Sequence, residues 1–328
     1  MFGAGSLSQA INIYVVENIA QTLVALGLVA ALIKLLRIAD PALRIRLLLL
    51  PIAVPLLAAP FYYAVFPNRQ ELPVLTLDKL IDLDEKISTL AGLPSLYVVI
   101  ESLFFALAAL FLTKGALTVA ASLYLRRRYA RLAPGACPRI DRLLESILQR
   151  TGGGKRPSVL FTPCEEVRCC VFGLGRAYIL VSKGLLDALP DEHLEAVLAH
   201  EVAHVRRHDS RLAGILVVLR HVLFFNPLVP LLARRIACES EKATDRLAVQ
   251  MSGKPVAYAE SLVGMWRVLP PARDHGHGEA RTFISRGPHL RERVLYVLEG
   301  SRQPTPRLHR WMPHMAGAAL FTGLFFVC

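Results

Sequence analysis

Four long apolar blocks limit the folds that this sequence can adopt. They cover residues 14–36, 47–66, 96–125 and 312–328, and the second runs for twenty residues without a charge. A helix of about 20 apolar residues is long enough to cross a bilayer. Hydrophobic residues make up 54% of the chain, more than in typical soluble domains. We therefore predict an α-helical membrane protein with about four spans in the lipid bilayer.

A fifth, shorter apolar block lies at residues 212–225. Its fourteen residues include Arg220 and His221 and end before the helix-breaking pair Asn226-Pro227. That length favours a re-entrant or interfacial helix over a full span. We expect residues 212–233 to contain a membrane-associated helix.

The distribution of charge predicts the orientation in the membrane. Basic residues gather at 34–46, 126–131 and 302–310, whereas the loop 67–95 is acidic. The positive-inside rule then places the N-terminus outside and residues 126–310 in the cytoplasm. These border arginines also account for the net charge of +12 and the pI near 9.7, so we expect no nucleic-acid partner. The predicted organisation is a three-span membrane domain at 1–125, a cytoplasmic domain at 126–310 and a final span at 311–328.

The cytoplasmic segment has the pattern of an α+β domain. Residues 140–150 predict a helix, residues 158–161 a short strand, and residues 171–181 two strands joined by a turn. A well-marked helix follows: Pro190 and Asp191 open it, and Arg206, Arg207 and His208 occupy its last turn.

This helix carries the run His200-Glu201-Val202-Ala203-His204. At about 3.6 residues per turn the two histidines lie on one face and can bind the same metal ion. Glu201 lies about 100° further round the helix, where it can act as a general base toward water without being a ligand. We predict that His200 and His204 bind Zn²⁺ and that Glu201 is the catalytic base. A helix with histidines on a merely polar face is the alternative.

A third ligand is available downstream, where Glu241 and Asp245 lie one turn apart on an expected helix. Glu241 completes a His2Glu zinc set, and Asp245 is placed to accept the free N–H of a ligating imidazole. Glu239 is a rival ligand, and a charged, solvated helix face is the alternative for the whole stretch. Cys238 is the nearest candidate for a fourth ligand, which would make the zinc structural and the protein a non-enzymatic signalling scaffold.

Residues 157–250 resemble a known family. The stretch is similar in sequence to the integral-membrane gluzincins. The similarity lies in the residues from Gly184 up to the motif, in the runs Arg207-His208-Asp209 and Phe225-Asn226-Pro227-Leu228, and in the expected helix with Glu241 and Asp245. Within these, the chain most resembles the antirepressor-type peptidase family of the β-lactam sensor-transducers, which is related to the heat-shock membrane proteases and the prenyl-protein endoproteases.

The resemblance implies a membrane-embedded zincin-type endopeptidase in a bacterial-type inner membrane. Such an enzyme would cut a protein or peptide substrate at the cytoplasmic face, in regulatory signalling. Broad-specificity quality control of membrane proteins is the alternative with the same chemistry. The sequence indicates no oligomeric state.

The resemblance also implies roles for two further segments. Peptidases of this class bind substrate as an added strand, which places the substrate backbone near Val171, Phe172 and Gly173; a purely structural hairpin is the alternative. The heat-shock branch carries a His-Pro pair ahead of an Arg-Ile, and the matching stretch here begins Arg286-Gly287-Pro288-His289. Because glycine replaces that histidine, either His289 or Arg286 is the transition-state donor, or the donor lies elsewhere in the chain.

Overall fold

The three longest apolar blocks form helices of membrane-crossing length. The computed structural model describes residues 4–65, 86–89, 92, 95–130, 137–151, 156–165, 167, 169–172, 178–268, 288–300 and 311–327. Among these residues, three helices are long and apolar enough to cross a membrane. They are α1 (Ala4–Leu35), with its apolar stretch at Tyr14–Leu35, α2 (Pro41–Val65), with its stretch at Pro41–Ala58, and α4 (Leu96–Ala130), with its stretch at Val98–Ala121. The expected mostly helical membrane protein is thus confirmed. α12 (Met312–Val327) has sixteen residues, and its role as a fourth span stays a prediction.

The start of α2 lies at Pro41 instead of the predicted residue 47. Proline suits the first turn of a helix, and Asp40 Oδ2 accepts the N–H of Leu43 at 3.0 Å, as a helix cap does. Arg44, which the hydropathy pattern excluded from the helix, donates from Nε to the carbonyl oxygen of Ile38 at 2.6 Å. A paired arginine therefore lies inside the first turn of this apolar helix.

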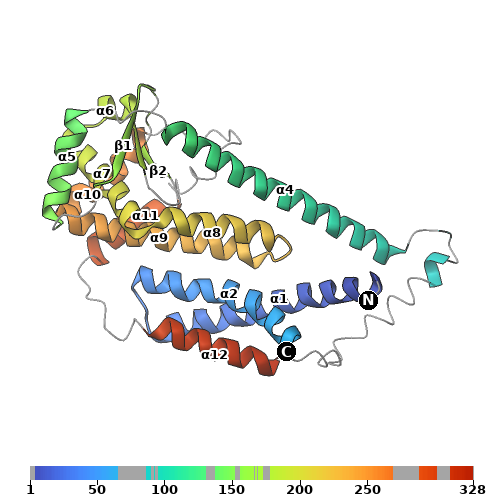
Figure 1. The fold of residues 1–328 in the computed structure, drawn as a ribbon. Helices are drawn as coiled ribbons and strands as arrows, with labels where there is room; N and C mark the ends of the chain where they lie inside the picture. Colours follow the sequence, from blue (N-terminus) through green and yellow to red (C-terminus); the bar gives the residue numbers. More distant parts are fainter. Residues whose placement is uncertain are drawn as a thin grey trace.

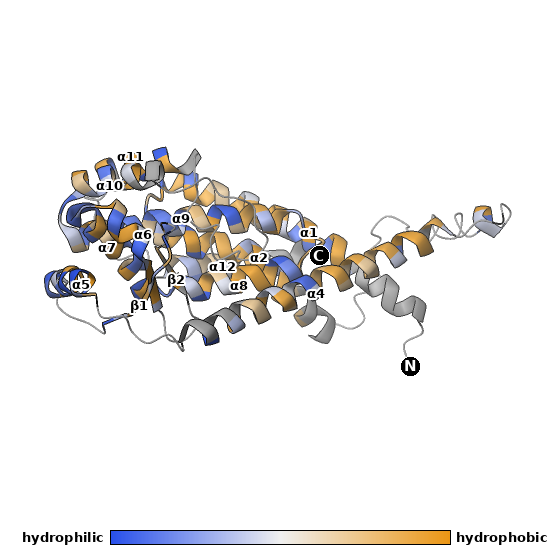
Figure 2. Cartoon of the chain, turned by 90° about the horizontal axis from the view of Figure 1, so that it is seen from above, coloured by the Kyte–Doolittle hydropathy of each residue, from blue (hydrophilic) through white to orange (hydrophobic). Residues whose placement is uncertain are grey.

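The membrane-type helices pack in a layered order. α1, α2 and α12 lie side by side, and α9 (Leu228–Ser252) packs against α2 (Figure 1). One apolar core joins these four helices and includes Val29, Ile52, Ile236 and Leu320. α4 packs along α8 (Asp209–Val222). The apolar stretch of α4 is largely exposed apart from its contact with α8 at Gly115, and the helix is apolar along most of its length (Figure 2), as a lipid-facing helix would be.

α8 corresponds to the predicted block at 212–225 and makes a close contact with α4. A Cβ added at Gly115 would come within 2.9 Å of the His221 Cβ, so only glycine permits this approach. Phe111 stacks on Phe224 with ring centroids 5.4 Å apart. These contacts make His221 a packing residue between two helices; the association of α8 with the membrane stays a prediction.

The turn from α8 into α9 is tied to α1 by buried hydrogen bonds. Asn226 is fully buried, and its Nδ2 donates to Asn18 Oδ1 at 3.0 Å and to Thr22 Oγ1 at 2.9 Å. Its Oδ1 accepts the N–H of Leu228 at 3.0 Å, at the start of α9. One amide side chain therefore fixes both the start of α9 and its distance from α1.

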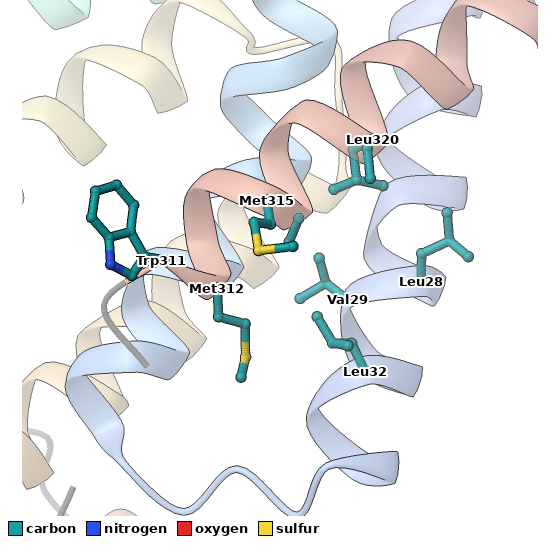
Figure 3. A pocket seen from close by; sticks show the side chains of 9 residues that line it. Leu28, Val29, Leu32, Trp311, Met312, Met315 and Leu320 are labelled. Atoms are coloured by element: carbon teal, nitrogen blue, oxygen red, sulfur yellow. The ribbon is translucent and has the colours of Figure 1, made fainter. Parts of the chain in front are cut away.

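An apolar cavity of about 1090 Å³ lies between α1 and α12 (Figure 3). Its lining includes Leu28, Val29 and Leu32 from α1, Met312 and Met315 from α12, and Trp311 just before α12. None of the predicted site residues lines this cavity, so the candidate chemistry lies elsewhere.

The middle of the chain forms a small sheet. β1 (Ser158–Thr162) pairs in parallel with β3 (Tyr178–Ser182), and β3 pairs antiparallel with β2 (Cys169–Phe172). The strand order β1-β3-β2 makes β2 an outer strand of this sheet. The predicted strands at 158–161 and 171–181 thus correspond to β1 and to the β2–β3 pair.

A second apolar core joins this sheet to the remaining helices. It is formed with α5 (Pro138–Arg150), α6 (Lys183–Ala188), α7 (Asp191–Arg207), α10 (Pro255–Val268) and α11 (Pro288–Gly300). The last turns of α9 join it through Ala248, Val249 and Met251, whereas Val229 and Ile236 belong to the first core. α9 therefore connects the membrane-type helices to the helices around the sheet.

Candidate metal centre

α7 presents its two histidines from a well-defined helix. It follows Pro190, and Asp191 and Glu192 lie in its first turn, where the helix dipole favours carboxylates. His200 is only 5% exposed. The helix ends at His208, whose φ of 58° is left-handed, a conformation that commonly ends helices. The resulting reversal starts α8 directly at Asp209.

Three side chains from α7 and α9 converge. His200 Nε2 lies 3.1 Å from His204 Nε2. Glu241 Oε2 lies 3.6 Å from Nε2 of His200, and Oε1 lies 3.7 Å from Nε2 of His204. Ligand atoms about 2.0–2.1 Å from a tetrahedral ion are roughly 3.3 Å apart. Within the described parts of the chain, His200, His204 and Glu241 are the group with metal-binding spacing.

The two rival ligands lie outside this group. Glu239 Oε1 lies 3.3 Å from Arg235 Nη2 and 3.4 Å from Arg44 Nη1, in a separate charge cluster. Cys238 is buried and is not among the three converging side chains. The structure therefore gives no support to a closed site with Cys238 as a fourth ligand.

The hydrogen bonds around the three side chains fit a metal ion. Nδ1 of each histidine already has partners, so each Nε2 is the nitrogen left to face the cluster. Glu241 Oε2 is buried and accepts no hydrogen bond from the described residues; its charge partner is the Arg293 guanidinium, whose Nη1 lies 3.1 Å away. Each carboxylate oxygen has more than one lone pair, so this contact leaves Glu241 able to bind a metal as well. Two imidazoles and one carboxylate form a donor set that suits zinc and several other transition metals.

His204 is oriented by Asp209. Asp209 Oδ2 lies 2.8 Å from Nδ1 of His204 and accepts hydrogen bonds from Thr244 Oγ1 at 2.8 Å and Arg207 Nε at 3.2 Å. Burial alone would lower the pKa of His204, but its hydrogen bond with Asp209 and the nearby carboxylates of Glu241 and Glu201 raise the pKa to about 9. Asp209 therefore fixes the ring and makes it more basic.

His200 is oriented by a buried tyrosine and a buried aspartate. The Tyr258 hydroxyl lies 2.8 Å from Nδ1 of His200 and donates to Asp245 Oδ1 at 2.7 Å. Asp245 Oδ1 itself lies 3.2 Å from that Nδ1. Burial would raise the pKa of Asp245, but the charge and hydrogen bonds of Arg293, together with His200, hold the pKa well below its usual range. Asp245 thus stays ionised at the base of the site.

Glu201 is buried beside the cluster. It is 5% exposed. Burial raises the pKa of Glu201 most, with a further rise from Glu241, while His204, His200 and Arg293 partly offset that rise. A carboxylate whose pKa is raised in this way accepts a proton more readily than one in water.

The structure describes only some of the residues predicted to bind substrate or to act as the transition-state donor. Val171 lies in β2 and pairs with Ile179 of β3. Phe172 and His289 are described by backbone only, in β2 and α11, and Gly173 and Arg286 lie outside the described residues. Sequence reasoning assigned no role to three residues that contact the site, Asp209, Tyr258 and Arg293.

The fold and the cluster define a class, the membrane metallopeptidases. Residues 48–297, most of the chain, match the profile of the family described as BlaR1 peptidase M56. The chain belongs to this family. The resemblance expected from the sequence is therefore confirmed.

Individual relatives match over shorter stretches. The methicillin resistance mecR1 protein of Staphylococcus aureus is 22% identical over 142 residues, which cover 43% of this chain and 24% of that protein. The protease HtpX homologue of Bacteroides fragilis is 37% identical over 82 residues, 24% of this chain and 25% of that protein. The homologue of Salinibacter ruber is 30% identical over 149 residues, 37% of this chain and 53% of that protein. The matches thus span between a quarter and about half of these relatives.

Proposed function

We propose that this protein is a zinc-dependent endopeptidase that hydrolyses a peptide bond of a protein substrate at the membrane. The observation that carries the proposal is the convergence of two imidazole nitrogens and Glu241 around a common point, with Glu201 on the same helix. The donor set is that of gluzincin-type catalytic sites, which use two histidines, a glutamate and an open position for water. A structural site would instead close with a fourth protein ligand.

Glu201 acts as the general base in this proposal. Its carboxylate accepts a proton from the attacking water and later donates that proton to the leaving amine. Burial raises the pKa of Glu201, which makes it a stronger base toward water than a carboxylate in solution. When bound, a zinc ion would act as a Lewis acid that polarises the substrate carbonyl and brings the pKa of water to about 7.

The residues behind the ligands keep them in the correct tautomer. Asp209 accepts the Nδ1–H of His204, and Asp245 with Tyr258 does the same for His200, so each Nε2 presents its lone pair to the metal. Sequence reasoning proposed this role for Asp245 alone. For the transition-state donor, His289 and Arg286 stay the candidates from the sequence.

The substrate is proposed to add as a strand along β2. β2 is an outer strand of the sheet and packs against α7, the helix that carries both histidines. An outer strand offers unpaired backbone groups to an extended peptide. Val171, Phe172 and Gly173 are the positions proposed to pair with it. A substrate peptide with an N-methylated backbone near the cut bond should therefore show a raised KM, whereas the same methyl group far from that bond should not.

The site is proposed to act at the cytoplasmic face, in regulatory signalling. The distribution of basic residues supports the cytoplasmic face, and the match to the BlaR1 peptidase family, which resembles the β-lactam sensor-transducers, supports regulatory signalling. The second candidate is broad quality control of membrane proteins, which the resemblance to the heat-shock membrane proteases implies. Comparing membrane proteomes of cells with active and Glu201→Gln protein separates the two: signalling predicts one or few stabilised substrates, and quality control predicts many.

The direct test compares three detergent-purified proteins: wild type, Glu201→Gln, and Glu192→Gln as a matched control on the exposed side of the same helix. We expect one zinc per chain in all three and cleavage of a membrane-tethered reporter by the wild type and Glu192→Gln only. Wild-type protein that binds no metal, or Glu201→Gln protein that cleaves as fast as the wild type, would overturn the proposal.

A further inference from the structure

Arg293 is a buried arginine that reaches the metal centre from α11. It is 4% exposed. Its Nε donates to Asp245 Oδ2 and its Nη2 to Asp245 Oδ1, both at 2.7 Å. Its Nη1 lies 3.1 Å from Glu241 Oε2. One guanidinium therefore contacts the carboxylate of the candidate ligand and the carboxylate behind His200.

The two contacts differ in kind. The two hydrogen bonds from Arg293 to Asp245 form a bidentate pair, which is the strongest geometry available to an arginine and a carboxylate. The contact with Glu241 has a short distance but does not satisfy Oε2 with a hydrogen bond. Glu241 is thus held by the positive charge while that oxygen keeps its lone pairs. This is the state in which a carboxylate can bind a cation.

Without Arg293, two carboxylates would lie unneutralised on successive turns of α9. Asp245 is fully buried and Glu241 is 2% exposed. Like charges in such a place repel each other. A displaced Asp245 would no longer hold the imidazole of His200, and a rotated Glu241 would leave the cluster.

α11 has other attachments to the protein. Val297 is 1% exposed and belongs to the core around the sheet. Glu292 Oε2 lies 2.8 Å from Lys242 Nζ. These contacts do not involve Arg293, so we expect them to remain in a variant at that position.

From this arrangement we infer that Arg293 is a positioning residue, which sets the affinity of the metal centre by holding Glu241 and Asp245 in place. The inference rests on the proposed function, in that His200, His204 and Glu241 bind the metal. Lysine cannot replace arginine fully, because a single ammonium group cannot form the planar fork to Asp245 while also reaching Glu241.

The test measures Zn²⁺ affinity by chelator competition in the detergent-purified full chain. The variants are Arg293→Gln and Arg293→Lys, with Arg291→Gln as a control because Arg291 is exposed on the same helix. Changes to partners of metal ligands typically weaken metal binding by about 10–100-fold. We expect a loss in this range for Arg293→Gln, a smaller loss for Arg293→Lys, and wild-type affinity for Arg291→Gln.

Two further measurements separate positioning from a general loss of structure. Val297→Ala loosens α11 without touching either carboxylate, so we expect a lower unfolding temperature and an unchanged Zn²⁺ affinity. Co²⁺ substituted for zinc gives a visible spectrum that reports ligand geometry, and it should change in Arg293→Lys but not in Val297→Ala. If Arg293→Gln does not fold, Arg293→Lys decides the matter.

The outcomes are distinct. Wild-type affinity in both Arg293 variants, or an equal loss in Val297→Ala, overturns the role of Arg293 and leaves the proposed enzyme intact. Absence of Zn²⁺ binding in the wild type overturns the proposed function itself.

Discussion

Replacement of Asp209 by asparagine tests how strongly the metal centre depends on its surroundings. The side chain keeps its shape and one acceptor oxygen but loses its charge. Asp209 Oδ2 accepts from His204 Nδ1 and Thr244 Oγ1, each at 2.8 Å, and from Arg207 Nε at 3.2 Å. Of these, the bond from His204 connects Asp209 to the metal.

The expected magnitude follows from the change in that one hydrogen bond. A hydrogen bond to a charged group contributes about 1.5–3 kcal/mol and a neutral one about 0.5–1.5 kcal/mol. The bond from His204 should therefore weaken by about 1–2 kcal/mol, which corresponds to roughly 5–30-fold in metal affinity. Removing the charge also makes His204 less basic, which weakens its bond to a metal. Protons compete with the metal for His204 below its pKa of about 9. A lower pKa in Asp209→Asn would offset part of the loss there, so binding is compared above pH 9.

The assay is the dissociation constant for Zn²⁺ just above pH 9, where protons no longer compete for His204, measured by chelator competition in detergent. Asp187→Asn removes an exposed charge just before α7 and serves as the matched control. We expect weaker binding in Asp209→Asn and wild-type binding in Asp187→Asn. Binding within twofold of the wild type in Asp209→Asn would show that the contact with His204 does not tune the metal centre.

Four further predictions concern the metal centre and the contact between α1 and the start of α9. Tyr258→Phe should weaken Zn²⁺ binding about tenfold, measured by the same competition, because the hydroxyl bridges His200 and Asp245; unchanged binding would contradict this. Since the pKa of His204 is raised from 6.5 to about 9, its contribution to the stability of the metal-free protein is complete below pH 6.5 and lost as the pH rises through about 9. Thermal unfolding without metal should show this decline, and a His204→Gln variant should lack it. Over the same range, metal binding should release a proton and tighten with rising pH until about 9, and calorimetry in two buffers should detect that proton. Asn226→Ala should lower the free energy of unfolding in bicelles by about 2 kcal/mol, through two lost interhelical bonds and one lost cap; Thr22→Val should cost less.

The membrane helices and the central motif were predictable because their signals are local. A block of apolar residues forms a helix in a membrane whatever surrounds it, so α1 and α4 lie where the hydropathy pattern placed them. The start of α2 was misplaced because Arg44 looks like a border residue in sequence. In the structure its charge is met by the carbonyl oxygen of Ile38 and by Glu239, which is 195 residues away.

The surroundings of the metal centre were harder to predict, because their partners meet only in the fold. Tyr258 and Arg293 contact Asp245 from α10 and α11. One signal for Arg293 was available in the sequence. It lies three residues after Leu290 and four before Val297, on the apolar face of α11, where an arginine needs a buried partner. Arg291, by contrast, faces outward.

The position of Glu241 depends on both apolar cores. α9 belongs to the first core from Val229 to Ala243 and to the core around the sheet from Ala248 to Met251, so Glu241 lies near the change from one core to the other. The histidines of α7 belong to the core around the sheet, so their distance from Glu241 is fixed only when both cores are formed. The motif His200-Glu201-Val202-Ala203-His204 therefore specifies two ligands by helical spacing alone, whereas the third ligand is a property of how the membrane-type helices and the sheet pack against each other.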